Sequence, residues 1–484
     1  LCGAWSLSGS PVEGLLPEAV RKAMRERAGG NRDVLSGRLW LSGSAKRWRQ
    51  DDGRVLSWDG FLPLDDSSAR SLTTWLDAPA PAAPPPACEG HYVLAVAGPA
   101  EDRSLTLLRD LTGGERFYFT RLGELVLFAS SLKALLSHDG VSRRLDPDLA
   151  FERGLSELVM FGDGLAIAGV HEVLPGHRLR LAGGIGPQEW VWADALEPVE
   201  GDPAELAQRL RSALASAVGR CVDGGSDVAV ALSGGIDSAS VAALAARAVG
   251  PRRVHAFTFK YEDPGHPSEV PAAAALCRHL GIKDHRVVRI SREAFLDAVP
   301  QAVWLGEDPV FWKRPFALLL SRAVMDAGFD RFLTGFGVGS HMAYLEELAG
   351  ALRWLPAPEM TLRYWARARR AQPGPPRYWE RLHPGLEAPF YRLYYPLLAA
   401  LRRRGVLSDL SSFFPAALAG RVEALADSAR VAGAVEELSA LPLSRFLQRL
   451  AFTHMNSCVD VARCERLSSA SGGAAWLGPA HLQS

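Results

Sequence analysis

Apolar and polar residues follow two different patterns in the two halves of the chain. Before about residue 195, short apolar runs are separated by turn residues, which is typical of antiparallel strands. The strands predicted by this pattern are 39–41, 55–58, 92–97, 104–108, 117–119, 125–129 and 178–181. The proline-rich stretch 78–87 suits neither a helix nor a central strand and predicts a surface loop. We therefore expect a β-rich N-terminal half.

The second half begins after a polar segment, 195–204, which is rich in proline and glycine and predicts a linker. Apolar runs then alternate with helix-forming stretches. The predicted strands are 228–232, 255–261, 285–290 and, with its exit loop, 331–337, and the predicted helices are 206–218, 239–246, 271–280, 293–305, 316–326 and 346–352. This alternation predicts a doubly wound parallel sheet, which binds nucleotides at the carboxyl ends of its strands. The expected domains are therefore 1–195 and 203–484.

The composition of the chain argues against several classes of protein but does not identify its function. The 484 residues have room for two or three domains, and 54 Lys and Arg balance 54 Asp and Glu. This balance gives no indication of a nucleic-acid partner. No apolar run reaches the length of a membrane span, and the N-terminus does not resemble a secretory signal. The six cysteines form no Cys-x-x-Cys pair, so neither a zinc site nor a disulfide framework is predicted. We expect a cytoplasmic protein.

The strand at 228–232 leads directly into the sequence Ser-Gly-Gly-Ile-Asp-Ser, which runs from Ser233 to Ser238. A glycine-rich loop before a helix brings main-chain N–H groups close to an anion, and the serine hydroxyls add donors. Asp237 would repel a bare phosphate, so it suits a site where Mg²⁺ lies between them. The loop has no lysine, which separates it from the Walker loop. A turn with glycines for close packing is the alternative interpretation.

The Ser-Gly-Gly-Ile-Asp-Ser string after an apolar strand resembles the pyrophosphate loop of the N-type ATP pyrophosphatases, and the surrounding chain resembles their asparagine-synthetase-like branch. The resemblance implies ATP and Mg²⁺ as cofactors, and cleavage of ATP to AMP and pyrophosphate. The residues then expected to bind ATP and pyrophosphate are Leu232, Ser233, Gly234, Gly235, Ile236, Asp237, Ser238, Thr258, Phe259, Gly335 and Phe336, with Asp237 as the metal ligand.

The N-terminal stretches 105–138 and 170–181 resemble class II glutamine amidotransferase domains, which implies an α+β sandwich of the Ntn type. Cys2-Gly3 is similar to the nucleophile of that family. Such a nucleophile uses its own α-amine as the base, whereas here Leu1 precedes Cys2. The family's glutamine-binding Asn-Gly-Glu would fall near 58–61, where neither the Asn nor the Glu is present. We expect a domain without glutaminase activity, with Cys2 as a buried residue of a first strand.

Two expected parts of the synthetase site are not found. Relatives carry an Mg²⁺-binding aspartate after the fourth strand and a catalytic lysine in a later helical segment. Here no carboxylate follows Gly335 before Glu346, and no candidate lysine is found near Ser484. Either these ligands are absent, or the sequence omits residues after Gly337 and after Ser484. The catalytic residue therefore stays unassigned.

Without a glutaminase, the amine must come from elsewhere, and the substrate itself is the expected source. β-Lactam synthetases and lasso-peptide cyclases both work in this way. The segments 263–269 and 307–309 are more similar to lasso cyclases, and 363–404 mixes arginines with aromatic residues. That stretch suits either a groove for a peptide or a solvated helical face over an aromatic core.

The resemblance thus implies a macrolactam synthetase that joins the N-terminus of a core peptide to an Asp or Glu side chain, with a leader peptidase and a leader-binding protein as partners. A β-lactam synthetase, a glutamine-hydrolysing asparagine synthase and a non-catalytic scaffold are the alternatives.

Overall fold

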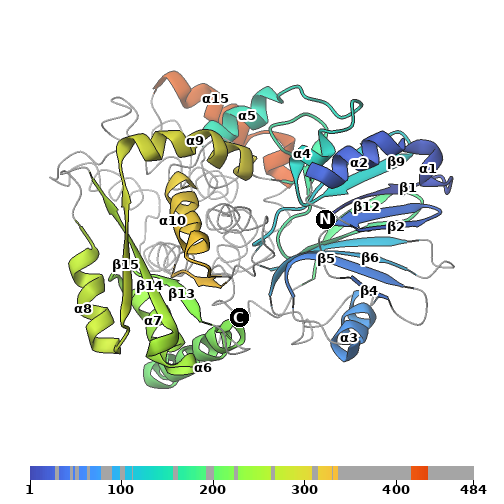
Figure 1. Cartoon of the computed structure of the whole chain (residues 1–484). Coiled ribbons are helices and arrows are strands. Elements are labelled where there is room, and N and C mark those ends of the chain that lie inside the picture. The colour runs from blue at the N-terminus through green and yellow to red at the C-terminus, as the bar shows by residue number, and fades with distance from the viewer. Residues whose placement is uncertain are drawn as a thin grey trace.

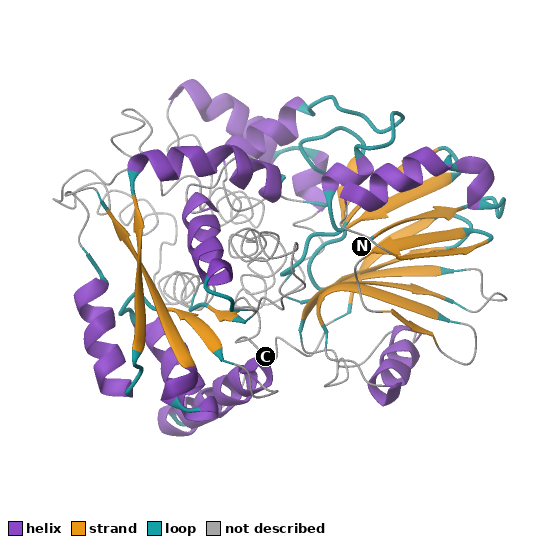
Figure 2. Ribbon diagram, in the orientation of Figure 1, coloured by secondary structure: helices purple, strands orange, loops and turns teal. Residues whose placement is uncertain are grey.

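A computed structural model describes residues 1–27, 32–43, 47–49, 54–62, 66–77, 90–98, 104–111, 113–155, 162–191, 201–222, 227–262, 268–307, 314–329, 331–335 and 416–433. These residues form an antiparallel sandwich and a parallel α/β unit that lie side by side (Figure 1). Figure 2 shows the stacked strands of the sandwich on one side and the twisted parallel sheet on the other.

The sandwich consists of two six-stranded antiparallel sheets. The first has the order β10-β8-β9-β1-β3-β2 and consists of β1 (Cys2–Ser6), β2 (Arg32–Ser36), β3 (Leu39–Gly43), β8 (Tyr118–Leu122), β9 (Leu125–Ala129) and β10 (Val170–Glu172). The second has the order β12-β11-β7-β6-β5-β4 and consists of β4 (Arg47–Arg49), β5 (Val55–Phe61), β6 (His91–Ala97), β7 (Leu105–Arg109), β11 (His177–Leu181) and β12 (Ile185–Trp190).

Helices cover both outer faces of the sandwich. The first sheet carries α1 (Val12–Leu15), α2 (Glu18–Arg27) and α4 (Leu132–Leu135), the second carries α3 (Asp66–Asp77), and α5 (Pro147–Leu155) follows α4 in the chain. Because side chains alternate along a strand, β1 contributes to two cores. Trp5 joins the core between the sheets, whereas Cys2 and Ala4 pack beneath the helices with Met24. The result is a four-layer arrangement.

The parallel sheet has the order β15-β14-β13-β16, from β13 (Val228–Ala231), β14 (Val254–Tyr261), β15 (Asp284–Ile290) and β16 (Phe332–Leu333). Its helices are α6 (Pro203–Val222), α7 (Ile236–Val249), α8 (Val270–Leu280), α9 (Arg292–Gly306) and α10 (Arg314–Asp326), with a short 3-10 turn η3 (Pro251–Arg253). α6, α7 and α8 pack on one face of the sheet and α10 packs on the other. Helices therefore cover both faces of β13, and this burial on both faces explains the uninterrupted apolar run at 228–232.

The strand order reverses at β13, and open α/β sheets form their ligand crevice at the carboxyl ends of the strands at such a point. β13 pairs with both β14 and β16, so the chain leaves β13 toward one side of the sheet and returns to β16 on the other. Open α/β sheets bind ligands where the strand order reverses in this way. Here that point lies between the loops that follow β13 and β16.

The two domains touch at two places in the described residues. α15 (Ala416–Ala426) and the residues just after it lie beside α5 (Figure 1). The guanidinium of Arg421 lies 3.9 Å from the ring centroid of Phe151, and Arg430 donates to the buried carboxylate of Glu152. The second contact joins the end of α9 to the start of α4.

The sandwich and the parallel sheet confirm the predicted fold, and several boundaries need correction. The stretch 170–181, whose resemblance implied a single strand closing the domain, forms two strands in different sheets, because the chain turns at Gly176, where φ is +71° and the N–H donates to the Asp110 carbonyl at 2.8 Å. α7 begins at Ile236, three residues before the predicted start, and β16 spans Phe332–Leu333, within the stretch 331–337 that was predicted as a strand with its exit loop. The predictions for 78–87, 346–352, 363–404 and Phe336 lie outside the described residues.

Across the described ranges, none of the helices combines the length and the apolar character needed to cross a membrane.

Candidate functional site

The loop after β13 is a tight turn with no room for a side chain at its centre. Gly234 has a φ of +83°, which favours glycine, and a Cβ there would lie 2.6 Å from the Cβ of Ala272 in the first turn of α8. α7 begins at Ile236, directly after the loop. The first turns of α7 and α8 therefore converge on this loop, and the free N–H groups at such helix starts favour an anion.

The two serines of the loop hold it closed. The Ser238 hydroxyl accepts the Ser233 N–H at 3.2 Å and donates to the Gly235 carbonyl at 3.1 Å. The Ser233 hydroxyl accepts the Gly235 N–H at 3.2 Å and lies 3.0 Å from the Ser238 hydroxyl. The Ser238 hydroxyl is buried and its hydrogen serves the loop, whereas Ser233 is half-buried, so donation of these hydroxyls to a phosphate stays a prediction.

The exit of β16 packs against the first turn of α7. A Cβ at Gly335 would lie 2.5 Å from the Ser238 nitrogen and 2.7 Å from the Asp237 carbonyl carbon. Only a residue without a side chain fits this approach of two main chains. The structure thus brings Gly335 next to the loop and the start of α7, and its predicted role in binding ATP stays a prediction.

Thr258, in the neighbouring strand β14, holds the residue that precedes the loop. Its buried hydroxyl donates to the Leu232 carbonyl at 2.6 Å, so the Nε2 of His285, at 2.9 Å, must be the donor in their contact. Burial lowers the pKa of His285, which favours its neutral form. Phe259 packs against Tyr261 and Phe316, with ring centroids 5.2 and 6.2 Å away. No local pattern in the sequence indicates His285, because its contact depends on the register of β14 with β15.

The outer side of the loop is open. Gly234 and Gly235 are exposed, the side chain of Ile236 is 82% exposed, and Asp237 is half-buried. Within the described part of the chain, no three His, Cys, Asp or Glu side chains gather to hold a metal. Asp237 fits Mg²⁺ only together with phosphate oxygens and waters, which is how nucleotide sites usually bind this ion.

In the amidotransferase-like domain, Cys2 and the segment 58–61 lie in different sheets. Cys2 is fully buried on the helix-covered face of its sheet, as expected. Asp59 lies instead beside Leu1, whose main-chain nitrogen is 3.3 Å from the carboxylate and 3.0 Å from the Ser130 hydroxyl. Gly60 has a φ of +95°, and a Cβ there would lie 2.3 Å from the His91 carbonyl oxygen. Cys2 therefore does not face the 58–61 strand.

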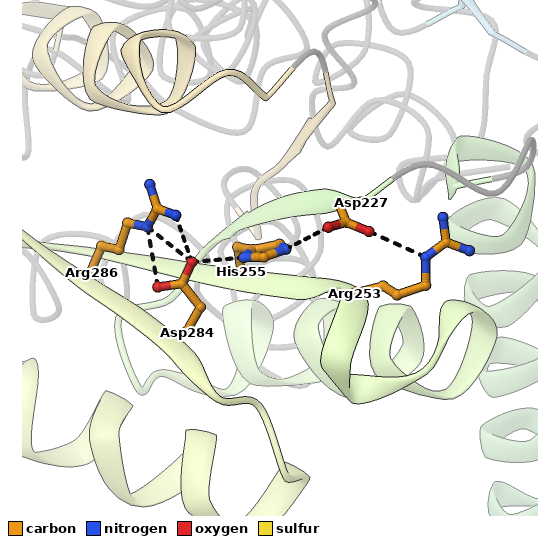
Figure 3. A network of polar contacts seen from close by, with 5 residues as sticks. All are labelled: Asp227, Arg253, His255, Asp284 and Arg286. Atoms are coloured by element: carbon orange, nitrogen blue, oxygen red, sulfur yellow. Dashed lines mark hydrogen bonds and ion pairs between the residues drawn. The ribbon is translucent and has the colours of Figure 1, made fainter.

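A polar network lies at the opposite, amino-terminal edge of the parallel sheet (Figure 3). The ring nitrogens of His255 lie 2.7 Å from the Asp284 carboxylate and 3.1 Å from the Asp227 carboxylate. Arg286 pairs with Asp284 at 2.7 Å, and Arg253 pairs with Asp227 at 3.2 Å. These contacts link the starts of β13, β14 and β15, so this network stabilises the sheet rather than the crevice.

Comparison with known proteins agrees with both halves of this description. The glutamine amidotransferase domain family matches residues 84–191, and the asparagine synthase family matches residues 209–464. "Amidase chyE" of Penicillium rubens is 27% identical over 50% of this chain and 38% of its own length. "Asparagine synthetase [glutamine-hydrolyzing] 3" of Bacillus subtilis is 28% identical over 46% of this chain and 38% of its own.

"Carboxyethyl-arginine beta-lactam-synthase" of Streptomyces clavuligerus is 31% identical over 35% of this chain and 33% of its own length. All three matches thus cover less than half of the relative's length. The asparagine synthase match extends over more than half of this chain and includes the loop after β13, α7 and the exit of β16. The chain therefore belongs to the asparagine synthase family, with a glutamine amidotransferase-like domain before its synthase domain.

Proposed function

We propose that this protein is an ATP-dependent ligase that forms an amide bond through an acyl-adenylate. A carboxylate oxygen of the substrate attacks the α-phosphorus of ATP, and the bond to the β-phosphate oxygen breaks to release pyrophosphate. An amine then attacks the acyl carbon, loses a proton and expels AMP. The observation that carries the proposal is the loop from Ser233 to Gly235, which sits before α7 at the reversal of strand order.

The residues of the crevice suit this reaction. The main-chain N–H groups at the start of α7 would bind the departing pyrophosphate, and Gly335 holds the other wall against Asp237 and Ser238. Asp237 would hold Mg²⁺, which would neutralise phosphate charge when bound. Thr258 fixes the Leu232 carbonyl and thereby the entry of the loop.

The amine is proposed to come from the substrate rather than from glutamine. Two observations support this: Cys2 is buried away from the strand that holds Asp59, and that strand lacks the Asn and the Glu of the family's glutamine-binding segment. The finer proposal is a lasso-peptide cyclase, in which the N-terminal amine of a core peptide attacks an activated Asp or Glu side chain. Its support is the likeness of 263–269 and 307–309 to lasso cyclases and the arginine and aromatic content of 363–404.

A β-lactam synthetase-like reaction is the second candidate, and the likeness to the Streptomyces clavuligerus enzyme favours it. An amide ligase that hydrolyses glutamine, as the name of the Bacillus subtilis relative describes, requires a working nucleophile in the first domain. For a peptide substrate, a leader peptidase and a leader-binding protein are the proposed partners, and the cytoplasm is the proposed compartment.

The test is to incubate the protein with ATP and Mg²⁺ and each candidate substrate, and to measure AMP, pyrophosphate and product mass. We expect a core peptide to be converted to a product that is lighter by one water, with its N-terminus blocked and one Asp or Glu consumed. We expect no glutamate from glutamine, and no change with Cys2→Ala. AMP formation only with aspartate plus glutamine, or only with small amino acids, would contradict the peptide proposal.

A further inference from the structure

Glu307 has an unusual main-chain conformation. It follows α9 directly, with φ of +56° and ψ of +23°, and is the non-glycine residue with positive φ in the described part of the chain. Glycine or asparagine usually ends a helix in this left-handed conformation. Glycine would adopt this conformation at a lower energetic cost, so we expect a compensating interaction from the side chain of Glu307.

The Glu307 carboxylate is held by the start of α4 in the other domain. It accepts hydrogen bonds from the N–H groups of Leu132 at 2.8 Å and Lys133 at 3.1 Å, and from the hydroxyl of Ser131. The ammonium of Lys133 lies 3.0 Å away, and the Glu307 side chain is only 1% exposed. Four donors from one short segment thus satisfy a carboxylate that is about 175 residues distant in sequence.

Lys133 adds a second contact with the end of α9. Its ammonium also donates to the Trp304 carbonyl at 2.6 Å and lies 4.9 Å from the Trp304 ring centroid. The neighbouring Ser130 donates at 2.9 Å to Asp59, in the segment 58–61 where the family's glutamine-binding residues would fall. The Ser130-Ser131 pair therefore connects the core of the first domain with the end of α9.

The end of α9 is linked to the nucleotide crevice through α10. Ala298 and Ala302 of α9 pack with Leu318 of α10. Near the start of α10, the ring of Phe316 contacts Phe295, Tyr261 and Phe259, with centroids 4.6, 4.7 and 6.2 Å away. Phe259 follows Thr258, the residue that supports the loop. A shift of α9 would therefore displace Phe316 and Phe259, next to the residue that holds the loop.

We infer that the amidotransferase-like domain serves as a clamp for Glu307, and that this clamp positions α9 and α10 against the nucleotide crevice. Glu307 is then a positioning residue, since it acts through Phe316 and Phe259. The inference gives the first domain a role that needs no glutamine chemistry. Its effect on catalysis rests on the proposed ligase function, whereas the clamp itself is tested without activity.

The experiment compares Glu307→Gly, Glu307→Gln and Lys133→Met with Glu293→Gln in the full chain. Glu293 is an exposed residue in the first turn of the same helix, at the end opposite to Glu307. The rate of hydrogen exchange at the Leu132 and Lys133 amides reports whether their hydrogen bonds to Glu307 are formed. The kcat of amide formation and the KM for ATP report the effect of these bonds on catalysis. We expect faster exchange at both amides in Glu307→Gly and Lys133→Met, and a smaller change in Glu307→Gln, which keeps one acceptor.

In Glu307→Gly we expect kcat to fall by about tenfold to a hundredfold while the KM for ATP is nearly unchanged. The reason is that the variant would misplace α9 and α10 rather than remove a group that binds ATP. Lys133→Met leaves the main chain at 307 intact and provides the same test if Glu307→Gly does not fold. Wild-type exchange and wild-type kcat in Glu307→Gly would overturn the inference. Inactivity of the wild-type protein with every substrate would instead count against the proposed function, and the exchange result would still decide the clamp.

Discussion

Gly335 and Ser238 lie in main-chain contact, and this contact joins the exit of β16 to the start of α7 at the proposed nucleotide site. A Cβ at Gly335 would come within 2.5 Å of the Ser238 nitrogen, which belongs to the first turn of α7. Because the obstacle is main chain rather than a flexible side chain, a larger residue would force β16 and α7 apart. The geometry of the proposed anion site therefore depends on one glycine outside the loop itself.

We predict that Gly335→Ala lowers the affinity for ATP by about tenfold or more, or roughly 1.4 kcal/mol, because the first turn of α7 is displaced. Calorimetric titration with ATP measures this. The matched control is Gly219→Ala in α6, where a Cβ would meet nothing within 4 Å. Alanine should stabilise that helix by about 0.5–1 kcal/mol and leave ATP binding unchanged. Equal affinities in both variants would show that the contact is not part of the site.

Thr258→Val tests the support beneath the loop. Valine keeps the shape of threonine but leaves the Leu232 carbonyl and the His285 Nε2 without their buried partner. We expect a loss of about 1–3 kcal/mol in the free energy of unfolding, measured with urea, together with weaker ATP binding. Thr74→Val, at an exposed position of α3, is the control and should change neither quantity appreciably. A variant as stable as wild type would mean that the threonine hydroxyl is dispensable.

The nucleotide half of the fold could be predicted because its signals are local. β13 is buried on both faces, so the apolar run 228–232 identified it, and the following glycines identified the turn. The start of α7 was misplaced, because it depends on the Ser233, Gly235 and Ser238 hydrogen bonds rather than on helix propensity.

The parts that were missed depend on tertiary contacts. β2, β4 and β12 lie at the edges of their sheets and carry polar sequences, so they lack the alternation that marks a half-buried strand. His285 gained its role only through the register of neighbouring strands. The contact between Glu307 and α4 joins residues of two domains, and no local pattern in the sequence predicts it.

The network at the amino-terminal edge of the sheet predicts loss of stability in acid. Arg286 and then His255 hold the pKa of Asp284 below its ordinary value, and His255 and then Arg253 do the same for Asp227. Such carboxylates stabilise the folded state above their unfolded value of about 3.9, and this contribution disappears as the pH falls through the lower folded value.

The measurement is the free energy of unfolding of wild type and Asp284→Asn at about pH 6 and about pH 3. We expect the variant to be less stable than wild type at the higher pH and to differ less from it at the lower pH. A difference that grows as the pH falls would contradict the assigned pKa direction.

Asp237→Asn tests the metal assignment. The side chain keeps its size but loses the charge that Mg²⁺ prefers. We predict that wild type binds ATP more tightly with Mg²⁺ than without it, and that the variant shows little difference while its thermal unfolding is unchanged. Titrations with and without the ion measure this. A variant that keeps the full effect of Mg²⁺ would remove Asp237 from the metal site.

The central claim is that a substrate carboxylate is activated by transfer of AMP. The direct measurement uses a peptide substrate whose Asp and Glu side-chain carboxylates carry ¹⁸O, incubated with the protein, ATP and Mg²⁺. Because the attacking oxygen stays with the phosphorus when the amine displaces AMP, we predict one ¹⁸O in each AMP for each amide bond formed. ADP as the product, with the label in inorganic phosphate, or amide formation with unlabelled AMP, would contradict the account.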